Sequence, residues 1–369
     1  LGAWSYMTIR RKLLSFGSRS TDVRLGFGAL DELPKFLSGA VGKPSRAYVL
    51  SSDDIDPVHI ETVRRALVDS GFNAAVRCIA ASDALGAETA LAQYAELSAA
   101  GITAEDLIVG VGGDEACSLA SYISRTWCGG VSCALVPTTL DAMIRCSTQM
   151  TPLTVSGGSL VSLEPEVSLV VCDLALVGDR PIEENGLGYA LMCGAYLSES
   201  RACWDSLGAA VRGIVEKNET SLSDALSTTL TARLNIAKSV SPSARRALLF
   251  GHTTARALSA CLGEGAHPYY LFLAEGMRFE ARLAIDACDF SVDEVFALDD
   301  HLEDLGIGEL SFDIDPAAFI EALRAERFRV ANRFQLALPK YPGVIRLSSI
   351  DDEVLERHAR AFIASRKPE

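Results

Sequence analysis

The stretch "DLIVGVGGDEACSLASYISRTWCGGVSCALVPTT" (106–139) contains the patterns of a strand, a helix and a second strand in immediate succession. Residues 106–113 are apolar and run into glycines, residues 114–127 repeat apolar side chains at helical spacing, and residues 131–139 are apolar up to a Pro-Thr-Thr turn. Strands that alternate with helices are typical of a parallel sheet, whose ligands bind beyond the carboxyl ends of the strands. The stretch therefore predicts a doubly wound α/β domain with its glycines and threonines at the binding edge.

The same alternation extends upstream of this stretch and stops downstream of it. Strand patterns occur at 47–52 and 73–80, and helical patterns at 56–71 and 86–101. From about residue 182 the chain changes to long helical segments, which are typical of a helix bundle. We predict a Rossmann-like domain over residues 1–180 and an all-helical domain over residues 181–369.

Composition and charge exclude several classes of protein. No run of eighteen apolar residues is present, so we expect no membrane-spanning helix. The net charge is −14 and the basic residues are scattered, which argues against a nucleic-acid partner. The ten cysteines form no CxxC pair, and the opening residues "LGAWSYM" (1–7) lack the pattern of a secretory signal. We expect buried free thiols and a cytoplasmic protein.

Three segments resemble one enzyme family. The segment 110–143, which ends in "PTTLDAM", resembles the 3-dehydroquinate synthases, or sugar-phosphate cyclases, which share their fold with iron-dependent alcohol and glycerol dehydrogenases. The segments "VRLGFGALDELPKFL" (23–37) and "GHTTARALSACLG" (251–263) extend the resemblance over most of the chain. It implies the family's two-domain fold, a lyase reaction of aromatic amino acid biosynthesis that uses NAD and a divalent metal such as zinc, and a homodimer.

The resemblance implies a cofactor site at the glycine loop. Glycines at a strand-to-helix junction let the backbone approach a pyrophosphate, and the helix N-terminus supplies N–H donors. Gly110, Gly112 and Gly113 match the family loop that holds NAD, and Thr138 and Thr139 match threonines that hold the nucleotide from the next strand. The alternative is that the two threonines form only a polar turn.

The resemblance also implies a metal and substrate site in the second half. His252 in "GHT" matches a catalytic histidine that binds the metal. A second metal ligand matches His267 only if the register slips by two residues, because the unslipped register places Tyr269 there. Arg245 matches a family arginine that contacts substrate, although it is equally compatible with a charge on a helix surface.

The chain departs from the family at most of its charged motif positions. Each departure removes a group that the family's chemistry requires, such as a metal ligand or a counter-charge for an anionic substrate. The replacements are Asp114 for a loop glycine, Ser118 and Arg145 for aspartates, Thr151 and Met192 for lysines, Tyr189 for the metal-binding glutamate and Arg256 for a histidine.

These departures support two hypotheses from different classes. The first is a catalytically impaired member, or pseudoenzyme, in which NAD and zinc bind weakly or not at all and which binds a small anionic molecule. The second is an active 3-dehydroquinate synthase or related cyclase with a rebuilt site. A relative of the iron-dependent dehydrogenases is a further alternative, but it would require three histidines and an aspartate on the metal, which this chain does not offer.

Overall fold

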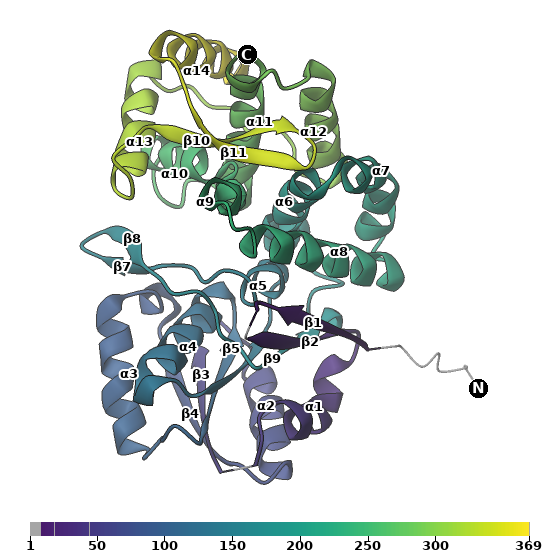
Figure 1. Ribbon diagram of the computed structural model, residues 1–369, viewed down its shortest axis with the longest axis vertical. Coiled ribbons are helices and arrows are strands. Elements are labelled where there is room, and N and C mark those ends of the chain that lie inside the picture. Colours follow the sequence, from purple (N-terminus) through teal and green to yellow (C-terminus); the bar gives the residue numbers. More distant parts are fainter. Residues whose placement is uncertain (1–8, 18, 44, 369) are drawn as a thin grey trace. The chain divides into compact units, whose positions relative to one another are not determined.

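The computed structural model describes residues 9–368 except 18 and 44 (Figure 1). The opening segment, for which we predict no secretory signal, lies outside the described residues. The chain divides into two compact units between Arg180 and Pro181. We describe each unit by itself.

The first unit is built on one mixed sheet. Its strands are β1 (Arg10–Ser15), β2 (Ser20–Gly26), β3 (Arg46–Ser52), β4 (Asn73–Ile79), β5 (Leu107–Gly112), β6 (Ser132–Pro137) and β9 (Leu169–Asp173). The order is β1-β2-β9-β6-β5-β3-β4, with only the β1–β2 pair antiparallel. The predicted parallel sheet is confirmed. Of these strands, sequence periodicity predicts only β3 to β6.

Helices cover both faces of this sheet. They are α1 (Leu33–Ala40), α2 (Pro57–Asp69), α3 (Ala87–Ala99), α4 (Asp114–Thr126) and the short α5 (Leu140–Arg145). Val49 and Val109 point to the face where Leu37 of α1 and Leu67 of α2 complete a buried cluster. Tyr48, one residue before Val49, points to the opposite face and donates a hydrogen bond from Oη to Gln93 Oε1 of α3, at 2.7 Å. This two-residue alternation produces the doubly wound arrangement.

The segment after α5 carries a small hairpin, β7 (Leu153–Val155) with β8 (Gly158–Val161). A single parallel bridge between Gly86 and Thr154 connects it to the start of α3. The N–H of Thr154 also donates to the carbonyl of Leu85, at 2.7 Å. These contacts fix the segment that contains Thr151 close to the sheet's carboxyl edge.

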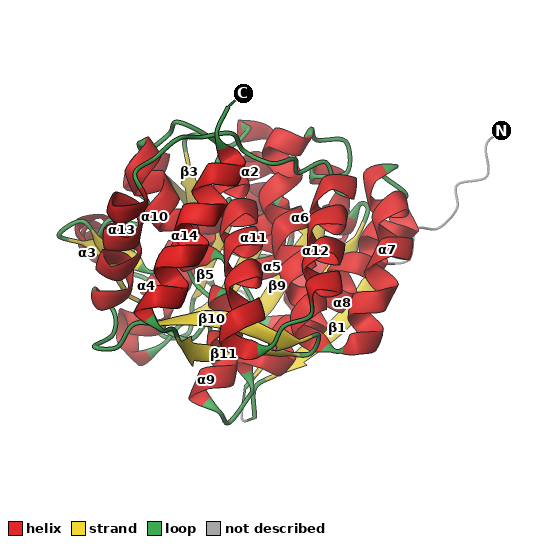
Figure 2. Cartoon of the chain, turned by 90° about the horizontal axis from the view of Figure 1, so that it is seen from above, coloured by secondary structure: helices red, strands yellow, loops and turns green. Residues whose placement is uncertain are grey.

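The second unit is mainly helical. Its helices are α6 (Ile182–Glu199), α7 (Arg201–Val215), α8 (Glu219–Ala237), α9 (Pro242–Arg245), α10 (His252–Leu262), α11 (Tyr269–Cys288), α12 (Val292–Asp304), α13 (Pro316–Phe328) and α14 (Asp352–Arg366). Figure 2 shows α11 between α6, α12 and α14, all of which it contacts. Gly276 of α11 allows the close approach of α10, because a Cβ there would lie 2.1 Å from the carbonyl oxygen of Gly251.

The second unit also contains strands, which the all-helical prediction for residues 181–369 does not include. β10 (Gln335–Tyr341) and β11 (Val344–Ser349) form an antiparallel hairpin that packs on α11. Gly343 in its turn has φ of +96°, a conformation that favours glycine. Pro339 obscures the strand pattern, since proline usually argues against a strand.

Two further expectations concern the whole described chain. The ten cysteines are all free, and five of them are buried: Cys117, Cys133, Cys146, Cys172 and Cys193. Among the described residues, no helix combines the length and the apolar character that crossing a membrane requires.

Candidate functional site

The glycine loop of the first unit joins β5 to α4. A Cβ at Gly110 would lie 2.7 Å from Ala120 Cβ, and one at Gly112 would lie 2.4 Å from Ile55 Cδ1. Both glycines are therefore required by the packing of strand against helix. Gly113 is the N-cap of α4 and has more space, with its nearest such neighbour, Glu115 Oε2, at 3.3 Å.

The two threonines lie at the same edge of the sheet. The N–H of Thr138, a residue 4% exposed, donates to the carbonyl of Gly112 at 2.8 Å. The Thr139 hydroxyl caps α5 by accepting a hydrogen bond from the N–H of Ala142 at 3.4 Å. The fold thus brings together Gly112, Gly113 and the threonines, as the sequence predicts, and gives Thr139 a local capping role as well.

Four of the departures from the family motifs contact one another beside this loop. Asp114, the first residue of α4, is 3% exposed, and its Oδ2 lies 3.2 Å from Arg145 Nη1. The Thr151 hydroxyl donates to the same Asp114 oxygen and accepts from Arg145 Nη2. The N–H of Thr151 donates to Ser118 Oγ at 2.8 Å. We call Asp114, Ser118, Arg145 and Thr151 the loop network.

The surroundings of the loop network are strongly acidic. Asp114 Oδ1 is buried and has no hydrogen-bond partner among the described residues. Burial and the nearby Asp114 charge raise the pKa of Asp141, and the same two causes raise the pKa of Glu115, whose side chain still reaches solvent. Three carboxyl groups therefore share this edge with the guanidinium of Arg145, an arrangement that disfavours a further anion.

The residues at this edge do not fit a dinucleotide pyrophosphate. Such a group needs the free N–H donors and the positive dipole end of a helix N-terminus. At the N-terminus of α4, the side chain of Asp114 places a buried carboxylate there. Arg145, the nearest counter-charge, is already paired with that carboxylate.

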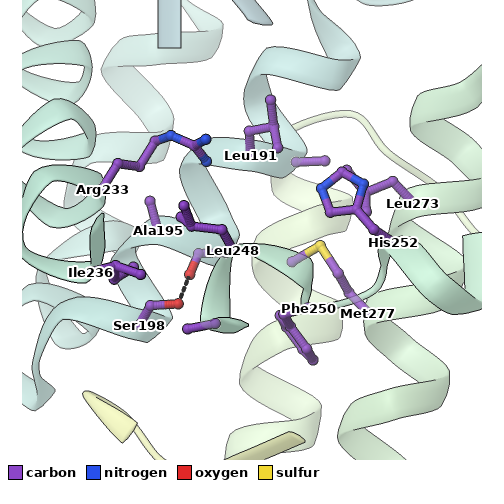
Figure 3. A pocket seen from close by; sticks show the side chains of 13 residues that line it. Leu191, Ala195, Ser198, Arg233, Ile236, Leu248, Phe250, His252, Leu273 and Met277 are labelled. Carbon is purple, nitrogen blue, oxygen red and sulfur yellow. Dashed lines mark hydrogen bonds between the residues drawn. The ribbon is translucent and has the colours of Figure 1, made fainter. Parts of the chain in front are cut away.

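In the second unit, His252 is the first residue of α10 and follows Gly251, whose φ is +79°. His252 Nδ1 lies 3.0 Å from Tyr269 Oη, and the two rings stack with centroids 6.1 Å apart. Figure 3 shows the imidazole beside Leu273 and Met277, at one end of a cavity that Arg233 also lines. The cavity volume is about 20 Å³, enough for one water molecule.

The other predicted residues of this unit have different partners. His267 packs edge-on against Phe272, with centroids 5.8 Å apart. Arg245 is exposed and donates from Nη1 to the carbonyl of Ser239 at 2.9 Å. Arg256 forms an ion pair with Glu326 at 2.9 Å. The aromatic partner of His252 is thus Tyr269, the residue that the unslipped register predicts at the second histidine position.

The residues at the family's metal-ligand positions do not fit a catalytic divalent cation. Tyr189, at the position of the family's glutamate, is 7% exposed, and burial raises the pKa of its phenol. It therefore stays neutral, whereas zinc sites use carboxylate, imidazole or thiolate ligands. No group of three or more His, Cys, Asp or Glu side chains among the described residues has an arrangement suited to a metal ion.

One buried acid near His252 was missed by the sequence analysis. Glu280 of α11 accepts hydrogen bonds from the N–H of Gly251 and from the Thr254 hydroxyl, both at 2.7 Å. Burial raises the pKa of Glu280 to about 7. The segment 271–287 carries five charged residues, so no local pattern singles out Glu280 as a buried acid.

Comparison with known proteins identifies relatives by sequence and by fold. No protein-family model matches the chain. A 3-dehydroquinate synthase from Caulobacter vibrioides is 27% identical over 287 residues, which span 75% of this chain and 78% of that protein.

Two solved structures have the same fold at low sequence identity. A 2-deoxy-scyllo-inosose synthase with carbaglucose-6-phosphate, NAD⁺ and Co²⁺ bound superposes with a TM-score of 0.83 at 15% identity, covering 95% of this chain and 100% of that one. A 2-epi-5-epi-valiolone synthase from Streptomyces hygroscopicus with NAD⁺ and Zn²⁺ bound superposes with a TM-score of 0.80 at 15% identity, covering 96% of this chain and 100% of that one. NAD and a divalent metal are thus present in structural relatives of this chain.

Proposed function

We propose that this chain, a diverged member of the 3-dehydroquinate synthase family, is a binding protein that no longer performs the family's NAD- and metal-dependent reaction. The fold is retained in both units, whereas most of the charged groups at the family's motif positions are replaced. The protein would then act by binding a small anion and not by turning it over. The alternative is an active synthase that binds NAD and metal through other residues.

The loop network carries this proposal. Random replacement of single motif residues would leave unpaired charges, yet the charges of Asp114 and Arg145 pair with each other and both residues hydrogen-bond to Thr151. The cation therefore compensates the carboxylate that occupies the pyrophosphate position at the N-terminus of α4. Such compensation favours a stable fold and disfavours NAD in the same place.

The surroundings of His252 support the same proposal independently. A catalytic zinc site uses about three protein ligands and leaves one position open. Of the family's set this chain retains His252, which contacts a phenol, while the glutamate position carries the buried Tyr189. Without a metal to polarise the substrate hydroxyl, hydride transfer to NAD loses a main source of rate.

The first test measures NAD affinity by calorimetry. We expect no binding by the natural protein at millimolar NAD, and measurable binding by Asp114→Gly. A carboxylate and a phosphate about 4 Å apart repel by up to about 4 kcal/mol at an effective dielectric constant of about 20, so we expect a gain of at least tenfold. Asp352→Gly is the matched control, because Asp352 is the first residue of α14. Micromolar affinity of the natural protein for NAD would contradict the proposal.

The second test measures turnover and metal content. Protein purified without chelator is analysed for metal, and phosphate release from 3-deoxy-D-arabino-heptulosonate 7-phosphate is followed with NAD and added Zn²⁺ or Co²⁺. We expect neither stoichiometric metal nor phosphate release. One metal per chain together with steady release would establish the active synthase instead.

A further inference from the structure

A second cavity in the helical unit has the features of an anion site. Its volume is about 420 Å³, within the range of small-molecule sites. It is bounded by α9, the following turn Arg246–Leu249, α13 and the hairpin β10–β11, which lie close together in Figure 1. Its lining includes Ser243, Arg246, Arg327, Val330, Gln335 and Leu347. All of these belong to the second unit.

Arg327 is the most informative of these residues. It is only 7% exposed, and its Nε is buried without a hydrogen-bond partner in the described part of the chain. The adjacent acid, Glu326, is directed to Arg256 and Arg329. A buried guanidinium nitrogen without an acceptor is costly, because its lost hydrogen bond to water is uncompensated.

The second cation of the cavity makes this arrangement more costly. Arg246 is exposed, and neither it nor Arg327 has an ion pair among the residues that the structure describes. Burial and the charge of Arg246 lower the pKa of Arg327, so the two guanidinium groups are close enough to repel. Two like charges that face one cavity without a carboxylate are stabilised when an anion binds between them.

The remaining wall combines two polar side chains, Ser243 and Gln335, with apolar surface. Ser243 Oγ accepts a hydrogen bond from the N–H of Leu347 at 3.0 Å, which leaves its own proton available to an acceptor in the cavity. Val330 and Leu347 add apolar side chains to the lining. Gln335 Nε2 donates to Ser349 Oγ at 3.3 Å. The wall therefore offers a polyhydroxylated ligand few free polar groups, whereas an apolar body would contact Val330 and Leu347.

We propose that this cavity binds a small amphipathic anion, that is, a carboxylate or phosphate group carried by an apolar body. The guanidinium groups of Arg246 and Arg327 hold the anionic oxygens, the Ser243 hydroxyl donates to them, and Val330 and Leu347 contact the apolar part. The proposal does not rest on the loss of NAD binding, since every residue involved lies outside the first unit.

The test is calorimetric titration of the full chain at low salt with phenyl phosphate, benzoate, glycerol 3-phosphate and phenol. We expect saturable binding of one phenyl phosphate or benzoate per chain, and weaker binding of glycerol 3-phosphate and of neutral phenol. Comparison of phenyl phosphate with benzoate shows whether the preferred oxyanion is a phosphate or a carboxylate. NAD is titrated separately, so a failure here is distinguishable from a failure of the proposed function.

Charge-matched variants locate the site. Arg246→Met should lower affinity roughly tenfold or more, the value of a charge-assisted hydrogen bond, and its exposed position should leave folding intact. Arg360→Met is the control, because that arginine forms an exposed ion pair with Glu356 on the surface of α14. The proposal is overturned if neither phenyl compound binds at millimolar concentration, if Arg360→Met weakens binding as much as Arg246→Met, or if glycerol 3-phosphate binds as tightly as phenyl phosphate.

Discussion

The loop network should be strongly coupled energetically, and a double-mutant cycle on Asp114 and Arg145 measures this. The two side chains are 4% and 14% exposed, and their charged atoms lie 3.2 Å apart. At an effective dielectric constant of about 20 this distance corresponds to roughly 5 kcal/mol of attraction, which is an upper limit. Desolvation of both groups offsets part of it, so we expect a coupling free energy of about 2 kcal/mol.

The single variants should differ in a defined order. Arg145→Met leaves the buried Asp114 carboxylate beside Asp141 without a cation, and should destabilise the first unit by about 3 kcal/mol or more. Asp114→Asn should cost less, because its amide oxygen can still accept the Thr151 hydroxyl proton. The double variant should lose less unfolding free energy than the two single variants lose together. With Asp114 replaced by Asn, Arg145→Met no longer leaves an unpaired carboxylate.

The assay is urea unfolding combined with hydrogen exchange of peptides from residues 107–126, which reports on the first unit separately. The same cycle on the exposed pair Arg360 and Glu356 serves as control, with an expected coupling of about 0.5 kcal/mol or less. A coupling between Asp114 and Arg145 no larger than that of the control would refute the reasoning, because the network would then contribute nothing beyond an ordinary surface pair.

Two further predictions concern the second unit. Folding raises the pKa of Glu280 from 4.5 to about 7. Between these two pH values the folded state keeps a proton that the unfolded state releases. The stability that Glu280 contributes therefore falls as the pH rises from 4.5 to about 7. The unfolding free energy of the natural protein relative to Glu280→Gln should therefore decrease by about 2–3 kcal/mol from about pH 5 to 8, and a constant difference would contradict this. Gly276→Ala should destabilise the protein by about 3 kcal/mol, because the new Cβ would lie 2.1 Å from the Gly251 carbonyl oxygen. Gly39→Ala in α1 is the control and should be neutral or stabilising, because a Cβ there meets open space. Equal melting temperatures for the two variants would disprove the close helix contact.

Local pattern alone was sufficient for the central strands β3 to β6 of the first unit and for the helices between them. Apolar runs that alternate with helical periodicity between residues 47 and 139 predict parallel strands and covering helices, and the structure contains them. Pattern was insufficient for the hairpin β10–β11, where Pro339 interrupts the strand signal, and for β9, a short apolar run. Short-range periodicity records which face of a segment is buried, and it does not record which distant segment completes the sheet.

The sequence by itself also determined which motif residues are missing, since each departure occupies a known position in the chain. Only the tertiary structure decided that these departures contact one another: Asp114 and Thr151 are separated by 37 residues, and Ser118 and Thr151 by 33. It likewise placed Tyr269 against His252 and brought Arg246 to the cavity of Arg327. The physical reason is that charge compensation depends on distance in space, which chain folding sets through contacts that no local pattern encodes.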